Sequence, residues 1–134
     1  MKLSKNNLDL TKSEEQIMQI LWKKGPSFVH EVISEFPAPK PAYNTVSTFI
    51  RILEKKGFVG HKAFGKSYQY RALISKEAYQ EKITGNLLEN YFGGSVSNLL
   101  SFFAEKEKLS EKEIEELRNI IEQAKKWATS SNIY

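Results

Sequence analysis

The spacing of the apolar residues along this chain changes from a helical period to a period of about two and then back again. Up to Gly57, apolar residues recur three and four positions apart, as on one face of an α-helix. From Phe58 to Leu73, aromatic and β-branched residues follow a period of about two on both sides of Gly65-Lys66. A glycine in the first of two turn positions favours a type II′ turn, so this segment predicts a β-hairpin. From Ser75 the helical period returns, and the expected fold class is mostly α with a small β-hairpin.

Prolines and helix caps divide the first half of the chain into three short helices. The first opens with the capping box Thr11-Lys12-Ser13-Glu14 and ends at Gly25-Pro26, where the proline cannot continue the helix. The second is expected over residues 27–36 and the third over residues 42–56. Three short helices followed by a hairpin is the order of elements in a winged helix-turn-helix, whose third helix enters the DNA major groove. The residues expected to face the core are Ile17, Met18, Leu21, Trp22, Val29, Val32, Ile33, Phe36, Val46, Phe49, Ile50 and Leu53.

The second half of the chain has little core of its own. Helices are expected over residues 76–92, over residues 96–104, and from Ser110, which begins a second capping box. The last helix carries an apolar seam, and nearly every other residue in it is charged. The apolar faces of these helices need another surface, either the first domain or a second copy of themselves.

Positive charge is concentrated in the first half. Residues 1–74 carry twelve lysines and arginines against six acidic residues, whereas residues 75–134 carry eight against ten. A compact basic unit suggests a polyanionic partner, although solubility alone would also explain the charge. No apolar run approaches the roughly 18 residues that span a bilayer, and no apolar segment follows the first five residues as it would in a signal peptide. A cytoplasmic protein is expected.

Motifs that would indicate an enzyme or a metal site are incomplete. The segment from Gly60 to Ser67 satisfies the spacing of a phosphate loop, but a predicted strand follows it where the phosphate-binding helix should begin. His30-Glu31-Val32-Ile33-Ser34 begins like a zinc-protease helix, with a serine where the second histidine is required. With two histidines and no cysteine, the chain is expected to hold no metal and no cofactor and to have no enzymatic activity.

The third predicted helix has the composition of a DNA-reading helix. Its inward stripe leaves an opposite face of amide, hydroxyl and cationic side chains, and Glu54 is its only acidic residue. Such groups pair with base edges and phosphates, although a solvated helix face without acids would look similar. The base-reading candidates are Asn44, Thr45, Ser47, Thr48 and Arg51, and Lys55 lies on the same face. The candidates for contacts with the DNA backbone are Tyr43, Lys62, Lys66, Ser67 and Tyr68.

Several segments, spread over about residues 8–125, carry a likeness to a known family. They are Leu10 to Pro26 with Glu14, Ile17, Met18 and Trp22, then Asn44-Thr45-Val46-Ser47-Thr48 leading to Leu53-Glu54-Lys55-Lys56-Gly57, and finally Tyr68-Gln69-Tyr70, Phe92-Gly93-Gly94 and Ile114-Glu115-Glu116-Leu117. Together they resemble the penicillinase and methicillin-resistance repressors, a family of winged-helix transcriptional repressors. The resemblance implies a homodimer held by the C-terminal helices that binds a palindromic operator and represses resistance genes. It also implies a membrane-bound sensor metalloprotease that triggers cleavage of the repressor.

Three features depart from the family pattern. Family members commonly have an arginine at the position of Ile52, whereas here the arginine is one residue earlier, at Arg51. The bond cleaved in the family joins an asparagine to a phenylalanine, and the matching pair here is Phe102-Phe103. The copper-responsive branch of the family binds metal through C-terminal cysteines. This chain has no cysteine, so copper sensing is excluded.

We therefore expect a winged-helix DNA-binding domain over residues 1–74 and a helical dimerisation domain over residues 75–134. The predicted function is that of a dimeric transcriptional repressor of β-lactam-resistance-type genes that is inactivated by proteolysis. Winged helices also serve as protein–protein modules, so an interaction adaptor without sequence-specific DNA binding is the alternative. The residues expected to hold the dimer are Leu99, Leu100, Phe103, Ile114, Leu117 and Ile121.

Overall fold

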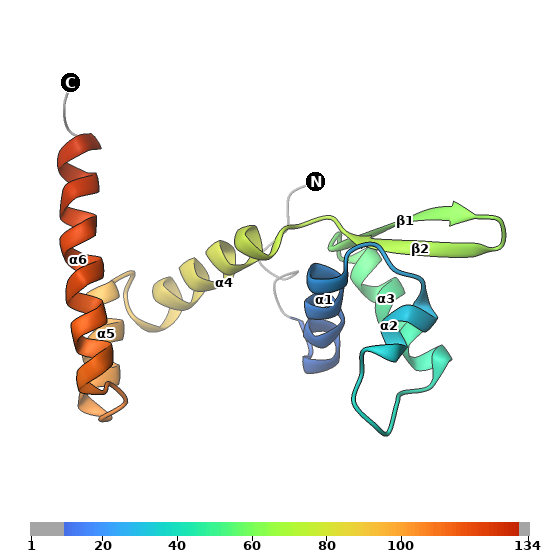
Figure 1. Cartoon of the computed structure of the whole chain (residues 1–134), viewed down its shortest axis with the longest axis horizontal. Coiled ribbons are helices and arrows are strands. Elements are labelled where there is room, and N and C mark those ends of the chain that lie inside the picture. The colour runs from blue at the N-terminus through green and yellow to red at the C-terminus, as the bar shows by residue number, and fades with distance from the viewer. Residues whose placement is uncertain (1–9, 132–134) are drawn as a thin grey trace. The chain divides into compact units, whose positions relative to one another are not determined.

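The computed structural model describes residues 10–131, with side chains up to residue 129, and its elements follow one another in the predicted order (Figure 1). The helices are α1 (Lys12–Lys24), α2 (Val29–Ser34), α3 (Tyr43–Lys55), α4 (Lys76–Tyr91), α5 (Val96–Glu105) and α6 (Glu111–Ser131), and the strands are β1 (Val59–Phe64) and β2 (Ser67–Ala72). The predicted fold class is confirmed, because three helices precede an antiparallel hairpin as in a winged helix and helices follow it. Within the described part of the chain, no helix is long and apolar enough to cross a membrane.

The second helix is shorter than its predicted range of residues 27–36. It begins only at Val29, because the backbone of Ser27 is engaged with the hairpin. The N–H of Ser27 donates to the carbonyl oxygen of Tyr70, and the N–H of Tyr70 donates to that of Ser27, both at 2.8 Å. This bridge ties the chain between α1 and α2 to β2.

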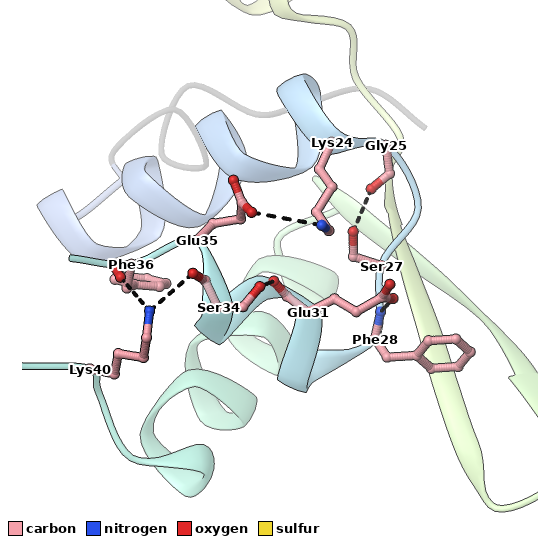
Figure 2. Close-up of polar contacts among 9 residues, drawn as sticks. All are labelled: Lys24, Gly25, Ser27, Phe28, Glu31, Ser34, Glu35, Phe36 and Lys40. Carbon is pink, nitrogen blue, oxygen red and sulfur yellow. Dashed lines mark hydrogen bonds and ion pairs between the residues drawn. The ribbon is translucent and has the colours of Figure 1, made fainter. Parts of the chain in front are cut away.

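Polar contacts restrain the chain on both sides of α2 (Figure 2). The Lys24 ammonium lies 3.7 Å from the Glu35 carboxylate and thereby links the end of α1 to the end of α2. Lys40 Nζ donates to the carbonyl oxygens of Ser34, at 3.0 Å, and Phe36, at 2.8 Å. Carbonyl groups at a helix end lack helical partners, so Lys40 caps α2 and anchors the loop that leads to α3.

The hydrophobic core lies among α1, α2, α3 and the base of the hairpin. The predicted core residues that are buried are Ile17, Met18, Leu21, Val29, Val32, Val46, Ile50 and Leu53. The other four, Trp22, Ile33, Phe36 and Phe49, are only partly buried, because they pack against the core from its edge. Phe58, which follows α3, is completely buried, and helical periodicity did not assign it to the core. Ile20 of α1 was missed in the same way.

The hairpin has the predicted turn. Its strands pair from Val59 with Ala72 at the base to Phe64 with Ser67 at the tip. Gly65 has a φ of +62°, a conformation that L side chains rarely adopt, while Lys66 keeps a negative φ, as in a type II′ turn. Because strand β2 follows this turn directly, the segment is a hairpin and not a phosphate loop.

The chain divides by its internal contacts into two units, one ending at Thr84 and the other beginning at Gly85. The first unit extends beyond residue 74 because Tyr79 of α4 is buried in it. The Tyr79 ring lies 5.5 Å from the ring of Trp22 and 5.7 Å from that of Phe58, between centroids. In the second unit, none of the described side chains is buried. The assignment of DNA binding to residues 1–74 and of dimerisation to residues 75–134 stays a prediction.

Candidate nucleic-acid interface

Helix α3 presents a polar face opposite the core. Its predicted core positions are buried or partly buried, whereas Asn44, Thr45 and Thr48 are exposed to solvent in its first two turns. No acidic residue occurs in the first turn, where the helix dipole is positive. Lys55 is exposed at the other end of the helix. This face therefore offers one amide, two hydroxyls and one ammonium group to another molecule.

A groove of about 460 Å³ lies between α3 and the tip of the hairpin. It brings together six of the residues predicted to contact DNA, three from α3 and three from the β1–β2 hairpin, which is the wing of the winged helix. The lining residues are Phe28, Val29, His30, Tyr43, Ser47, Arg51, Lys66, Ser67, Tyr68 and Tyr70. These include two cationic side chains and no carboxylate, so the groove is suited to an anion.

The other five predicted DNA-contact residues lie outside this groove. Asn44, Thr45, Thr48 and Lys55 lie along α3, and Lys62 lies on β1; all five are exposed. The Lys62 ammonium is 5.4 Å from the centroid of the Phe64 ring, at the distance of a cation–π contact. The predicted residues thus fall into one set on the exposed face of α3 and one in the groove beside it, and Lys62 stands apart from both on β1.

Ser47 and Arg51 are joined within the groove. Arg51 Nη2 donates to Oγ of Ser47 at 3.1 Å. The Arg51 side chain is exposed, whereas Ser47 retains only 6% of its surface, so Ser47 is the less accessible of the two. The Ser47 hydroxyl thereby supports the guanidinium one helical turn later. Its role as a base reader stays a prediction.

A histidine connects the wing to α3. His61 Nδ1 contacts the carboxylate of Glu54, and the His61 ring stacks on the Tyr68 ring with centroids 4.3 Å apart. The only acidic residue of α3 is thereby held against β1. Burial raises the pKa of Tyr70, and the nearby Glu54 carboxylate raises it further, so its hydroxyl stays protonated. The wing is positioned by ring packing as well as by its backbone pairing.

Four residues of the groove, Phe28, Val29, His30 and Tyr70, were not among the predicted DNA contacts. The rings of Phe28 and His30 are stacked at 6.0 Å between centroids, and Phe28 also meets the Phe64 ring edge to face at 5.9 Å. Their place follows from the backbone bridge between Ser27 and Tyr70, which joins residues far apart in the sequence. No local pattern signals such a bridge.

The predicted dimerisation residues form an apolar surface that the described part of the chain covers only in part. A groove of about 310 Å³ between α5 and α6 is lined by Leu100, Phe103, Lys108, Leu109, Glu113, Glu116, Leu117 and Ile120. Three of the six predicted residues line it. Of the others, Leu99 is partly buried, and Ile114 and Ile121 remain 41% and 48% exposed.

The predicted cleavage pair lies inside α5. Phe102 and Phe103 are 46% and 38% exposed, and both belong to the helix rather than to a loop. The Phe102 ring meets the rings of Phe92 and Phe103 edge to face, each at 5.8 Å between centroids. The two side chains are accessible, whereas the bond between them is held in helical conformation.

Among the residues described, no group of three or more His, Asp or Glu side chains is arranged to hold a metal ion.

Comparison with known proteins gives a consistent picture. A family model described as "Penicillinase repressor" matches residues 10–123. The chain is 34% identical over 114 residues to the methicillin resistance regulatory protein MecI of Staphylococcus aureus (strain N315), covering 84% of this chain and 93% of that protein. It is 28% identical over 117 residues to the penicillinase repressor of Bacillus licheniformis, covering 87% and 91%. The solved structure of a MarR family protein from Bacillus stearothermophilus is similar with a TM-score of 0.48 and 18% sequence identity, and the match covers 92% of this chain and 79% of that one.

Proposed function

The chain belongs to the penicillinase repressor family, and we propose that it acts as a dimer on a palindromic operator in double-stranded DNA. Membership of this family makes it a transcriptional repressor and not an enzyme. We propose that α3 enters the major groove and that the wing lies along the adjacent backbone. The protein would act in the cytoplasm, where the DNA is.

The observation that carries this proposal is the convergence of α3 and the wing. The exposed amide and hydroxyls of Asn44, Thr45 and Thr48 lie on the same helix as Arg51. Arg51 in turn shares a groove with Lys66 at the wing tip. Base-reading groups beside a cationic groove are what a DNA-binding helix requires, because base contacts specify the sequence while phosphate contacts position the protein.

Dimerisation is supported by the second unit, which has no buried side chain among the residues described. Apolar residues line the groove between α5 and α6, and Ile114 and Ile121 are exposed on α6. A second copy of these helices would cover such a surface, and a two-fold dimer would place two copies of α3 on two half-sites. The operator is then palindromic.

We further propose that the protein controls β-lactam-resistance-type genes and is released from DNA by proteolysis. The relatives at 28% and 34% identity are named for penicillinase and for methicillin resistance. A cut between Phe102 and Phe103 would separate the winged helix from α6 and so divide the proposed dimer surface. Two linked winged-helix units bind DNA far more tightly than one alone, so the cut would release the protein from the operator. The partner that this step requires is a membrane sensor metalloprotease.

A binding selection tests the proposal against the alternative of an interaction adaptor. Full-length protein is used to enrich DNA from a random pool, and the affinity for the enriched sequence is measured at increasing salt. We expect a palindromic sequence and a steep loss of affinity, since each neutralised phosphate contributes about −0.9 to the slope of log affinity against log salt. No enriched sequence, together with an affinity that does not depend on salt, would favour the adaptor.

A further inference from the structure

We propose that Arg51 holds a phosphate of the DNA backbone in the groove between α3 and the wing and does not read a base. This inference rests on the proposed function and narrows it. By its chemistry alone Arg51 could also read a base, but this inference assigns it to the DNA backbone. Ser47, one helical turn earlier, becomes the residue that positions Arg51.

The first support is the direction in which Arg51 is held. Its Nη2 is 3.1 Å from the Oγ of Ser47, and Ser47 is buried. Residues four apart lie above one another on a helix, so this bond keeps the guanidinium on the edge of α3 that carries Ser47. Thr45 and Thr48 lie farther round the helix and contribute nothing to the groove.

The second support is the chemistry of the groove. Besides Arg51 it contains the ammonium of Lys66 and the hydroxyls of Tyr43, Ser67 and Tyr68, and none of its lining residues is acidic. Phosphate oxygens only accept hydrogen bonds, so they suit a site made of cations and hydroxyl donors. A base edge presents both donors and acceptors, and no carboxylate lines the groove to accept from a base amino group.

The third support is the position of the groove within a winged helix. When a recognition helix enters the major groove and the wing touches the backbone beside it, the space between the two follows a sugar–phosphate strand. Tyr43 begins α3 and Lys66 is the second turn residue of the wing, so the groove runs between those two elements. Base reading is then left to Asn44, Thr45 and Thr48, which are exposed outside the groove.

The experiment compares Arg51→Ala with Thr48→Ala in the full-length protein, after both variants have been shown to unfold at the same urea concentration as the unsubstituted chain. Each protein selects its preferred sequence from random DNA, and affinities are measured at several salt concentrations. We expect Arg51→Ala to select the unchanged sequence, to bind every sequence about tenfold more weakly, and to lower the salt slope by about one. Thr48→Ala should relax the preference at one base position and leave the slope unchanged.

Methylphosphonate substitution locates the contact. Replacing one phosphate at a time with this neutral group should reveal one position where the unsubstituted protein loses affinity and Arg51→Ala loses much less, because its partner charge is already gone. Lys55→Ala is the matched control. It removes a cation from the same helix outside the groove and should leave the sensitivity of that phosphate intact. Arg51→Lys should restore the salt slope.

The outcomes separate this inference from the proposed function. If Arg51→Ala changes the selected sequence at one position and no phosphate loses its sensitivity, Arg51 reads a base, and the inference is wrong while the repressor function stands. If the unsubstituted protein selects no sequence and binds independently of salt, both are overturned.

Discussion

The ammonium nitrogen of Lys56 lies 2.9 Å from a carboxylate oxygen of Glu14 and thereby joins the beginning of α1 to the residue that follows α3. Glu14 is almost completely buried and also accepts a hydrogen bond of 2.9 Å from the N–H of Thr11. Burial by itself raises the pKa of Glu14, but the Thr11 N–H and the Lys56 ammonium together hold the pKa below its ordinary value of 4.5. The carboxylate of a helix cap therefore also fixes the end of the proposed recognition helix.

Replacing Glu14 with glutamine should destabilise the protein at neutral pH. The substitution removes the buried carboxylate charge that faces the Lys56 ammonium, and we expect the free energy of unfolding to fall by about 1 to 3 kcal/mol at pH 7. Because the pKa of Glu14 is lower in the folded than in the unfolded chain, its stabilising effect is complete above about pH 4.5 and is lost as the pH falls through the lowered folded-state pKa. Urea unfolding at pH 7 and at successively lower pH measures the difference.

Glu15→Gln is the control for this prediction, since Glu15 occupies the same helical turn and is exposed. Its effect should be within about 0.5 kcal/mol. A Glu14→Gln difference that does not shrink on acidification would show that charge is not what stabilises the pair.

Tyr79 should be required for the stability of the winged-helix unit although it lies after residue 74. Its ring is buried against Trp22 and Phe58, so Tyr79→Ala should cost about 3 kcal/mol. Tyr91→Ala removes the same side chain from the other end of α4, where it is 76% exposed, and should cost little. Thermal unfolding monitored by circular dichroism compares the two. Equal losses of stability in the two variants would mean that Tyr79 does not pack against Trp22 and Phe58 as described.

Lys66→Ala should weaken binding to all DNA sequences alike. The ammonium lies at the tip of the wing and we expect it to contact phosphate, so its loss should lower the salt slope by about one and leave the selected sequence unchanged. Fluorescence anisotropy with operator and unrelated duplexes measures both quantities. Lys125→Ala on α6 is the control. A loss confined to the operator would assign Lys66 to base recognition.

Leu117→Asp should convert the proposed dimer to monomers. Leu117 lines the groove between α5 and α6, and an unpaired carboxylate buried there would weaken association at least about a hundredfold. Arg118→Asp places the same acid at the adjacent, exposed position and should leave the dimer intact. Analytical ultracentrifugation distinguishes the two, and a Leu117→Asp dimer would place the interface elsewhere.

Induction should produce an N-terminal fragment that ends at Phe102. Because the bond to Phe103 lies within α5, cleavage requires the helix to open locally and should be slower than cleavage of a loop. Phe102→Asn restores the residue pair typical of the resembled family and should accelerate cleavage. Intact-mass analysis of protein from cells treated with a β-lactam detects the fragment. Derepression with only full-length protein present would exclude the proteolytic step.

Local features of the fold could be predicted from the sequence because each depends on residues only a few positions apart. The capping box of Thr11 and Glu14, the turn at Gly65 and the helical stripe of α3 all formed as expected. The period of the apolar residues likewise distinguished helices from strands, because the backbone of each element alone decides which side chains share a face.

Which residues line the candidate site, and which partners they contact, depends on contacts between residues that are distant in the sequence. The Ser27–Tyr70 bridge shortened α2 and brought Phe28 and His30 into the groove. Ser47 is buried and accepts a hydrogen bond from Arg51, and Tyr79 packs into the first unit although it lies after residue 74. Residue type states which chemistry a side chain can perform. Which partner it meets is determined only when separate elements pack, since packing selects one arrangement among many that local propensities allow equally.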